Sequence, residues 1–430
     1  MRKTETSDRT NSSSDSQNKL VVFDVEGVVI PKGKFLLFDV VGQKNLKSFL
    51  EATSVGVFYE AGLMPLKRAL ESLYILLKGF ALNQFLVVFE NVPLLPGVEE
   101  TFCELRKSGI KTALISSGIP RIALENLGQR LGVDFVSGLE VGVSDGVLTG
   151  EIWGDVIEPD GKAVALKQII EGNKLSSYYL VGVADDRNNL SMFKLCDLKI
   201  GYNPDFVLSR KSDAAVRGEL TSIIPVIKYG VLSSPNHNLP RNTCIREAIH
   251  IGSFLISLVC MHFLNRYFVA FLLLLLTILY TSSELMRMLG THVPFFTDIT
   301  KSAARKSEYQ EFVSSPLFFA LGIMLSLMFF PEPTCYVSIT VLTLGDGFAS
   351  VFGQTFGNKQ IPYNKIKYVE GTISGFTFAF LGSTLFVHPF KALIASAVGM
   401  FIESLPLPLN DNLAIPLSSG LALAICSSII

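Results

Sequence analysis

The sequence predicts an α/β parallel sheet with a helical cap, followed by an all-α membrane domain of about seven helices. Three observations predict this. Short β-branched runs alternate with helical stretches between about residues 19 and 230, which is typical of a parallel sheet. From about 33 to 92 that alternation gives way to apolar, helical sequence. After about residue 245 most charges disappear and long apolar stretches follow, as expected for membrane spans.

The composition indicates that one part of the chain faces water and another part faces lipid. A mean hydropathy of +0.42, with 17% charged residues, is too apolar for an ordinary soluble enzyme. The net charge of −1 gives no reason to expect a nucleic-acid partner, because such binding needs a concentrated basic face. Six scattered cysteines, without a CxxC pair or a histidine cluster, predict free thiols in a reducing compartment and no zinc site.

Composition also divides the chain into segments. Residues 1–18 are polar and predict a disordered tail. The runs LVVFD, TALISS, DFVSGLEV, YYLVGVAD and LKIGYN predict the strands of a Rossmann-like domain at 19–230, with its cap inserted at 33–92. A linker is expected at 231–244, where SSPNHNLPRN stands, and a polytopic domain at 245–430.

The polytopic domain contains seven candidate spans. Several are shorter or more polar than the ~20 residues of an ideal span. If the first domain is cytoplasmic, the loops that hold most of the lysines and arginines also lie inside, as the positive-inside rule expects. The sequence thus predicts a multi-pass membrane protein with a cytoplasmic N-terminal domain. The candidate spans are 246–264, 267–285, 312–330, 334–352, 371–388, 392–406 and 412–430.

Two carboxylates follow the first predicted strand, at Asp24 and Glu26. Strand ends of this kind form the ligand-binding edge of an open parallel sheet. Asp24 could attack phosphorus as a nucleophile while Glu26 moves the proton. An acidic pair at a strand end is also ordinary loop chemistry, so this pair alone does not establish a site.

Three further polar groups strengthen the hypothesis. Ser116 ends the strand TALISS, Lys162 lies in GKAVALK, and Asp185 ends the strand YYLVGVAD. A hydroxyl and an ammonium group stabilise the charge of a transferring phosphoryl group, and Asp185 can hold Mg²⁺ opposite Asp24.

With these motifs, residues 20 to about 210 resemble the haloacid dehalogenase superfamily, in particular its phosphoserine-phosphatase-like branch. LPGVEE, DGVLTG and NNLSMFKLCDLKI also match that branch. The resemblance implies Mg²⁺-dependent phosphomonoester hydrolysis through an aspartyl-phosphate. The roles that it implies are nucleophile for Asp24, acid/base and backbone metal ligand for Glu26, phosphate ligands for Ser116 and Lys162, metal ligand for Asp185 and support for Asn188.

Two departures from the branch leave an alternative open. The branch usually has Asp where Glu26 and Asn189 stand here. A domain altered in this way could bind a lipid phosphate as a sensor instead of hydrolysing it. The apolar cap could receive a greasy substrate, form its own core or dock on the bilayer.

Ionisable residues in or beside membrane spans are costly, so each is a functional candidate. Helix packing explains the glycines of LGDGFASVFGQTFGNK, and the positive-inside rule explains the nearby lysines, but neither explains the acidic residues on one side of the membrane. No GxxxxGK[ST] motif is present, which excludes a Walker P-loop. The candidate residues for binding a nucleotide or lipid phosphate are Arg246, His250, Asp346, Lys359, Lys365, Lys367, Glu370, Glu403, Asp411 and Asn412, with Asp346 also a metal candidate.

Through GDGFASVFGQTFGNK, PYNKIKYVEGTISGF and DNLAIPL, the chain from about residue 245 resembles the family of dolichol kinase, phytol kinase and CTP-dependent diacylglycerol kinase. The resemblance implies transfer of the γ-phosphoryl group of CTP to a membrane alcohol, such as phytol, geranylgeraniol or dolichol. It implies CTP-phosphate binding for Lys359, Lys365 and Lys367, and metal or base roles for Asp346, Glu370 and Asp411.

The leading hypothesis is a bifunctional enzyme whose partners are the bilayer, a nucleotide and a lipid alcohol or lipid phosphate. One alternative is cytidylyl transfer to a CDP-lipid, as in phosphatidate cytidylyltransferases. Another is a membrane-anchored phosphatase or sensor with a non-catalytic partner domain. The sequence specifies neither the alcohol nor the oligomeric state.

Overall fold

The computed structural model describes residues 18–32, 46–60, 63–230, 241–288, 291–304, 312–407 and 409–429. The chain forms two compact units, one made mainly of residues up to 232 and the other mainly of residues from 233 onward. The predicted tail, apart from its last residue, lies outside the described residues. So do the first part of the predicted cap and the linker up to residue 240.

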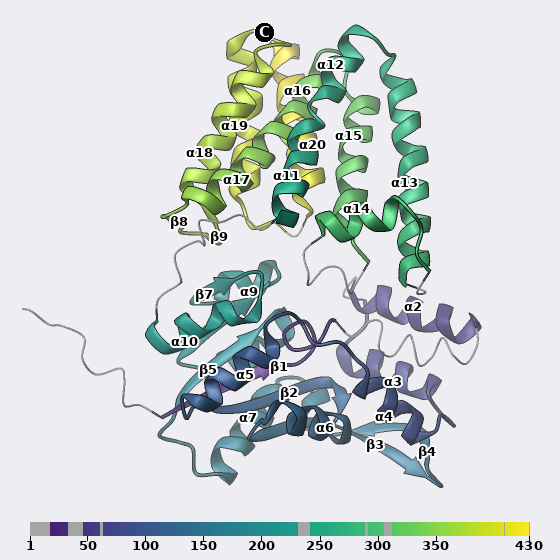
Figure 1. Ribbon diagram of the computed structural model, residues 1–430, viewed down its shortest axis with the longest axis vertical. Coiled ribbons are helices and arrows are strands. Elements are labelled where there is room, and N and C mark those ends of the chain that lie inside the picture. Colours follow the sequence, from purple (N-terminus) through teal and green to yellow (C-terminus); the bar gives the residue numbers. More distant parts are fainter. Residues whose placement is uncertain are drawn as a thin grey trace, which may run out of the picture. The chain divides into compact units, whose positions relative to one another are not determined.

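The first unit contains a seven-stranded sheet of order β4-β3-β2-β1-β5-β6-β7 (Figure 1). All neighbouring strands are parallel except β3 and β4, which form an antiparallel pair. The predicted α/β class is therefore confirmed. The strands are β1 (Lys19–Asp24), β2 (Lys111–Pro120), β3 (Phe135–Ser144), β4 (Val147–Trp153), β5 (Tyr179–Ala184), β6 (Leu198–Tyr202) and β7 (Ala214–Val216).

Two of these strands, β4 and β7, were not among the five predicted. Strand β7 has only three residues, too few for a period to show. Strand β4 follows the turn Asp145-Gly146, where both residues have positive φ. An Asp-Gly pair at that position is a strong hairpin signal, and it could have revealed β4.

Helices connect the parallel strands and cover the sheet. Strand β1 is buried along almost its whole length, as a central parallel strand must be, and Phe23 stacks on Phe102 of α5 with ring centroids 4.7 Å apart. This packing holds the end of β1 in place. The helices are α5 (Val98–Lys107), α6 (Arg121–Leu131), α7 (Gly161–Gly172), α8 (Leu190–Phe193), α9 (Phe206–Lys211) and α10 (Ile224–Tyr229), with short 3-10 turns at Asp155–Ile157, Arg187–Asn189 and Leu220–Ile223.

The described part of the predicted cap consists mainly of three helices: α2 (Leu46–Glu60), α3 (Leu66–Leu76) and α4 (Leu82–Glu90). It pairs with the β3–β4 hairpin, because Gly79 N donates to Leu148 O and Leu148 N donates to Phe80 O, at 2.8 and 2.9 Å. Among the apolar cap residues, Tyr74 and Phe85 are buried, as expected for a cap that forms its own core, while Phe58, Leu63 and Ile75 are exposed. Roles in substrate binding and in docking on the bilayer stay predictions.

The second unit is helical, with a two-stranded ribbon of β8 (Gln360–Ile361) and β9 (Asn364–Tyr368). A helical segment coincides with each of the seven predicted spans. Helix α14 was not predicted, and α11 begins at Arg241, inside the predicted linker. The helices are α11 (Arg241–Gly252), α12 (Leu255–His262), α13 (Arg266–Met288), α14 (Phe296–Ala303), α15 (Ser315–Phe329), α16 (Thr334–Thr340), α17 (Gly347–Phe356), α18 (Val369–Ser383), α19 (Pro389–Ser404) and α20 (Asp411–Ile429).

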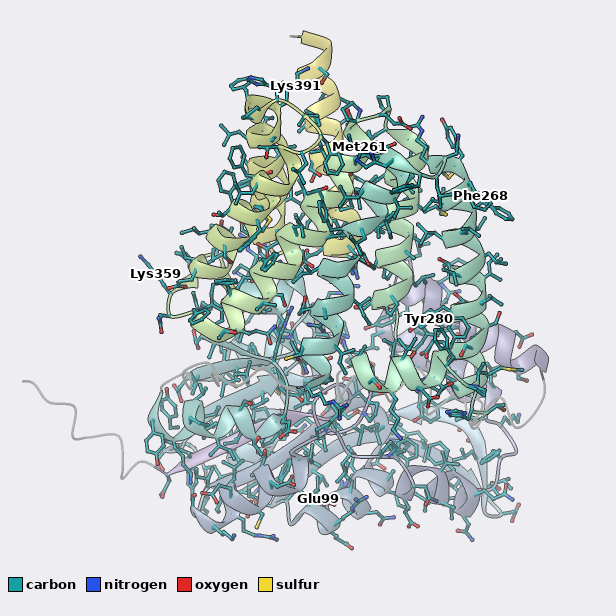
Figure 2. All side chains as sticks on the ribbon, turned by 45° about the horizontal axis from the view of Figure 1, so that its top comes forward. Glu99, Met261, Phe268, Tyr280, Lys359 and Lys391 are labelled. Carbon is teal, nitrogen blue, oxygen red and sulfur yellow. The ribbon has the colours of Figure 1, made fainter. Side chains whose placement is uncertain are left out.

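Among the described residues of this unit, three helical segments are long and apolar enough to cross a membrane: Arg241–His262, Arg266–Met288 and Thr334–Phe356. Their exposed faces carry large apolar side chains, such as Met261 and Phe268. Figure 2 shows Phe268 pointing away from the helices. A helix satisfies its own backbone polar groups, so an apolar outer face of this kind suits lipid.

Candidate functional site

Asp24 stands at the end of β1 and is almost fully buried. Its Oδ1 accepts hydrogen bonds from Val25 N at 2.8 Å and from Lys162 Nζ at 2.7 Å. Its Oδ2 accepts one from Asn189 Nδ2. Donors that approach from three parts of the chain hold the carboxylate in one orientation, as a nucleophile requires.

Lys162, the second residue of α7, also donates to Asn189 Oδ1 at 2.8 Å. Burial alone would lower the pKa of this ammonium group, but the carboxylates of Asp24 and Asp186 outweigh it and the pKa is raised. Lys162 therefore remains a cation next to Asp24. A buried, fixed positive charge is suited to a phosphoryl group.

Asp24, Asp185 and Asp186 form a candidate metal site. One oxygen from each carboxylate lies within 4.8 Å of the others. Asp185 is almost fully buried, and Lys32 Nζ forms an ion pair with its Oδ2 at 2.7 Å, while its Oδ1 has no hydrogen-bond partner among the described residues. Burial raises the pKa of Asp185 to about 8, even though Lys32 opposes this. A buried carboxylate oxygen without a donor suits Mg²⁺, which prefers oxygen ligands.

Asp186 was not a predicted site residue. Besides belonging to the carboxylate group, it accepts from Asn189 Nδ2 and from Asn188 N, both at 3.0 Å. The sequence signal was present, because two adjacent aspartates follow strand β5. Asp186 supplies a negative charge beside Asn189. At the position of Asn189 the phosphoserine-phosphatase-like branch usually has an aspartate.

Glu26 lies two residues beyond the nucleophile. Burial, and then the charge of Asp24, raise the pKa of Glu26 to about 7. A carboxyl group with a pKa near 7 can both donate and accept a proton at neutral pH. Its carboxylate lies over Gly118, where an added Cβ atom would be 2.6 Å from Oε2. The binding of Mg²⁺ by the Glu26 backbone carbonyl stays a prediction.

Ser116 is fully buried in the irregular part of β2. Its Oγ accepts the N–H groups of Gly118 and Ile119, both at 3.1 Å. These bonds fix the oxygen and leave the hydroxyl proton for a phosphate oxygen. The structure thus gathers the candidates from four separate segments at one end of the sheet: Asp24, Glu26, Ser116, Lys162, Asp185 and Asn188.

The cap adds two tyrosines that the sequence did not suggest. Asn188 Nδ2 donates to the Tyr59 hydroxyl at 2.6 Å and to Asp186 Oδ2 at 3.0 Å. The Tyr74 hydroxyl donates to Gly118 O at 2.9 Å. Tyr59 comes from α2 and Tyr74 from α3. The cap therefore contacts both the segment after β5 that holds Asp186 and the part of β2 that holds Ser116.

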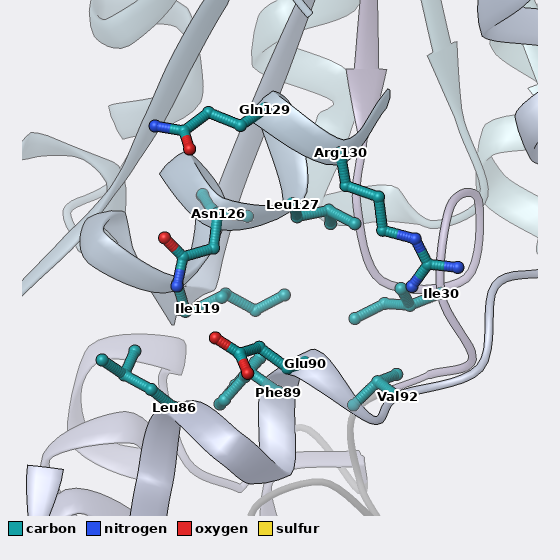
Figure 3. A pocket seen from close by; sticks show the side chains of 12 residues that line it. Ile30, Leu86, Phe89, Glu90, Val92, Ile119, Asn126, Leu127, Gln129 and Arg130 are labelled. Atoms are coloured by element: carbon teal, nitrogen blue, oxygen red, sulfur yellow. The ribbon is translucent and has the colours of Figure 1, made fainter. Parts of the chain in front are cut away.

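A cavity of about 390 Å³ lies between cap helix α4 and core helix α6. Ile30 and Val92, on the two connections between cap and core, line it together with Leu86, Phe89 and Leu127. Figure 3 shows Glu90 and Asn126 facing it from opposite elements. The cap thus meets the core over a largely apolar cavity with a polar rim.

Gly27 permits the close approach of Asp185. A Cβ atom at this position would lie 2.1 Å from Asp185 Oδ2, and its φ is +82°. We expect Gly27→Ala to weaken Mg²⁺ binding by about 10–100-fold, because it displaces a metal ligand. The Mg²⁺-dependent rise in unfolding temperature measures this.

Gly146→Ala is the matched control. Gly146 has a similar φ of +76° but no atom within 4 Å of an added Cβ, so it carries the backbone strain without the clash. Equal Mg²⁺ affinity in both variants would contradict the close-approach argument.

In the second unit, Lys367 of β9 joins two acidic candidates. Its Nζ lies 2.8 Å from Glu403 Oε1 and 2.7 Å from Asp411 Oδ2. Burial alone would lower the pKa of Lys367, but Glu403 and Asp411 raise it, so the cation is retained. These residues come from β9, α19 and α20, and together they form a partly buried charged cluster in which Glu403 is buried.

His250, Asp346 and Asn412 extend this cluster. His250 Nε2 lies 3.1 Å from Asn412 Oδ1 and 3.7 Å from Asp346 Oδ2. Asp346 also interacts electrostatically with Lys367. It ends the π-helical segment Val341–Asp346, and such segments frequently mark functional sites.

The remaining candidates have other partners. The Lys359 N–H donates to both carboxylate oxygens of Glu370, at 3.1 and 3.3 Å, at an exposed position. Arg246 pairs with Glu247 at 2.8 Å, and Glu247 also accepts from Ser350. Lys365 is half-buried on β9. Phosphate-binding roles for Lys359 and Lys365, and a metal or base role for Glu370, stay predictions.

Known proteins match both parts of the chain. Residues 21–194 match the haloacid dehalogenase-like hydrolase family. A phosphoserine phosphatase of Methanocaldococcus jannaschii is 27% identical over 219 residues, which cover 50% of this chain and 100% of that protein. A solved structure described as a phospho-aspartyl intermediate analogue of phosphoserine phosphatase is 26% identical, with a TM-score of 0.43, and covers 49% of this chain and 98% of that one.

Other relatives are kinases. Chloroplastic phytol kinase 1 of Arabidopsis thaliana is 28% identical over 214 residues, which cover 44% of this chain and 68% of that protein. Chloroplastic farnesol kinase of the same plant is 31% identical over 155 residues, which cover 32% of this chain and 50% of that protein. The chain therefore joins an N-terminal haloacid dehalogenase-like domain of the phosphoserine-phosphatase type to a second domain related to phytol and farnesol kinases.

Proposed function

We propose that this chain is a bifunctional enzyme of lipid-phosphate metabolism. The first domain hydrolyses a phosphomonoester with Mg²⁺, and the second transfers the γ-phosphoryl group of CTP to a membrane alcohol of the polyprenol class. The observation that carries the proposal is the presence in one chain of two lysine-centred carboxylate clusters, one buried around Lys162 and one partly buried around Lys367. Each combines a fixed cation with acidic groups, as phosphoryl transfer requires.

In the first domain the reaction divides into two steps. Asp24 attacks phosphorus and forms an aspartyl-phosphate, while Glu26 protonates the leaving oxygen. Glu26 then takes a proton from the water that hydrolyses this intermediate, which its pKa of about 7 permits. Lys162 and Ser116 bind the phosphoryl oxygens. Mg²⁺ held by Asp24, Asp185 and Asp186 would neutralise charge on the phosphoryl group.

In the second domain Lys367 is the group best placed to bind nucleotide phosphates. It is held by Glu403 and Asp411 from two helices, so its position is determined before a ligand arrives. Asp346 lies at the start of α17, in the glycine-punctuated GDG segment. The glycines on both sides of it allow close packing, because an added Cβ atom would lie 2.8 Å from Met400 Sδ at Gly345 and 2.6 Å from Ile251 Cγ1 at Gly347.

One observation favours a second candidate function for the first domain. Asn189 replaces an acid and donates its amide to Asp24 Oδ2, so both oxygens of the nucleophile are already hydrogen-bonded. A domain of this kind could bind a lipid phosphate without hydrolysing it. Binding of farnesyl phosphate without release of phosphate would favour this sensor.

The test uses the full-length protein purified in detergent, Mg²⁺, γ-labelled CTP and a panel of prenols. We expect label in a prenyl phosphate, and its loss with Asp346→Ala. Release of pyrophosphate together with a CDP-lipid would instead indicate cytidylyl transfer. Absence of both products with every alcohol would contradict the proposed kinase activity.

A further inference from the structure

The hydroxyl group of Tyr59, on cap helix α2, lies beside the candidate site of the first domain. It accepts a hydrogen bond from Asn188 Nδ2 at 2.6 Å. The same amide nitrogen donates to Asp186 Oδ2 at 3.0 Å. Because a carboxylate only accepts hydrogen bonds, this second contact fixes which end of the Asn188 amide faces the tyrosine. Tyr59 is therefore the acceptor in its bond with Asn188, and its own proton is not used there.

The Tyr59 hydroxyl remains available as a donor. Its proton has no acceptor among the residues that the structure describes, and both oxygens of Asp186 already accept from Asn188 and Asn189. Burial is the main cause that raises the pKa of Tyr59, so the hydroxyl keeps its proton at neutral pH. The side chain is half-buried and interacts electrostatically with Asp186 and Lys162. The donor therefore stands next to the charged groups of the site and is open to a ligand.

Phosphoryl oxygens are the acceptors that suit this donor. A phosphoryl group brings three strongly accepting oxygens. The donors described so far, Lys162 Nζ and the Ser116 hydroxyl, belong to α7 and β2 of the core. Tyr59 belongs to the cap, so it adds a donor from an element that supplies neither of the others.

Building on the proposed hydrolysis, we propose that Tyr59 is a substrate-binding residue that donates a hydrogen bond to a non-bridging phosphoryl oxygen of the phosphomonoester. The product, inorganic phosphate, keeps this contact, because the contact does not involve the leaving group. The location of Tyr59 on α2 makes the cap a part of the phosphate-binding site. A phosphomonoester therefore binds tightly only while α2 is in place on the core.

The role of Tyr59 can be separated from that of Asn188. Two bonds to Asp186 hold Asn188, one from its N–H to Oδ1 and one from its Nδ2 to Oδ2, both at 3.0 Å. Removal of the phenolic oxygen leaves these two bonds in place. A loss of phosphate affinity in Tyr59→Phe therefore reports the missing hydroxyl and not a displaced Asn188.

The test compares Tyr59→Phe with the wild-type full-length protein in detergent with Mg²⁺. Hydrolysis of p-nitrophenyl phosphate gives kcat and KM, and calorimetry gives the dissociation constant of inorganic phosphate. We expect KM and this dissociation constant to rise together by about 10–100-fold, because a hydrogen bond to a charged acceptor is lost. We expect kcat to stay within a few-fold of its wild-type value, because the hydroxyl binds the substrate and the transition state alike.

Tyr229→Phe is the matched control, because Tyr229 is a largely exposed tyrosine of the same domain, and it should leave all three quantities unchanged. An unchanged Mg²⁺-dependent rise in unfolding temperature verifies that Tyr59→Phe keeps the fold and the metal site. Tyr59→Leu also lacks the hydroxyl and should show the same loss of phosphate affinity.

A phosphate affinity of Tyr59→Phe within a few-fold of the wild type would overturn the binding role of Tyr59, whatever happens to kcat. If the wild type bound phosphate but hydrolysed no ester, the proposed hydrolysis would be wrong, and the comparison of phosphate affinities would still decide the role of Tyr59. A wild type that neither bound phosphate nor hydrolysed an ester would overturn both.

Discussion

Asp24→Asn should abolish phosphomonoester hydrolysis, with a loss of about 10⁴-fold or more, the scale on which removal of a nucleophile acts. An amide cannot attack phosphorus, and the change also removes one of the three carboxylates of the candidate metal site. Phosphate release from p-nitrophenyl phosphate and from farnesyl phosphate measures the loss. Label from a ³²P-substrate should remain on the quenched wild-type protein but not on the variant.

Asp145→Asn provides the control for this substitution. Asp145 lies in the β3–β4 turn with φ of +52°, a conformation that asparagine also tolerates. Its hydrolysis should equal that of the wild type. In both variants the transfer of label from CTP to a prenol should be unchanged, because each proposed site is built from its own unit of the chain. Wild-type hydrolysis by Asp24→Asn would rule out the covalent mechanism.

Lys367→Met should have two effects on the second domain. It removes the cation proposed to bind nucleotide phosphates, so kinase activity should be lost. It also leaves Glu403 nearly fully buried without its charge partner, which costs about 3–5 kcal/mol in other proteins. Thermal unfolding in detergent and transfer of label from CTP measure the two effects separately.

The double variant Lys367→Met/Glu403→Gln separates binding from stability. Removing the unpaired carboxylate should recover much of the unfolding temperature, while the kinase activity remains absent. Lys391→Met, at an exposed lysine of α19, is the control for loss of a positive charge. If the double variant recovered kinase activity together with stability, Lys367 would have a structural role only.

The class of each half of the fold could be predicted from the sequence because it depends on local periodicity. Strand and helix periods distinguish the sheet from the cap, and apolar stretches mark the spans. The short strand β7 was missed because three residues show no period and its pairing with β6 stabilises it. Strand β4 was missed although the Asp145-Gly146 turn before it is a hairpin signal. Helix α14 is short and combines polar, charged and apolar residues, so no periodic signal distinguished it.

The grouping of the site candidates in the first domain could be predicted for a related reason. Its residues follow strand ends, and parallel strands bring their carboxyl ends to one edge of the sheet. That rule predicts from the sequence alone that Asp24, Ser116 and Asp185 lie close together. It could not identify Tyr59, whose hydroxyl reaches Asn188 from the cap, because the packing of the cap against the core is not encoded in strand order.

The sequence by itself therefore determined the two domain classes and the placement of the strand-end residues at one edge of the sheet, since both follow from periodicity and strand order. Only the tertiary structure decided which polar residues of the second domain act together. Lys367, Glu403 and Asp411 meet although 36 and 44 residues separate the lysine from the acids, while Lys359 pairs its backbone with Glu370 elsewhere. Helix packing selects such partners, and no local pattern records how separate helices pack.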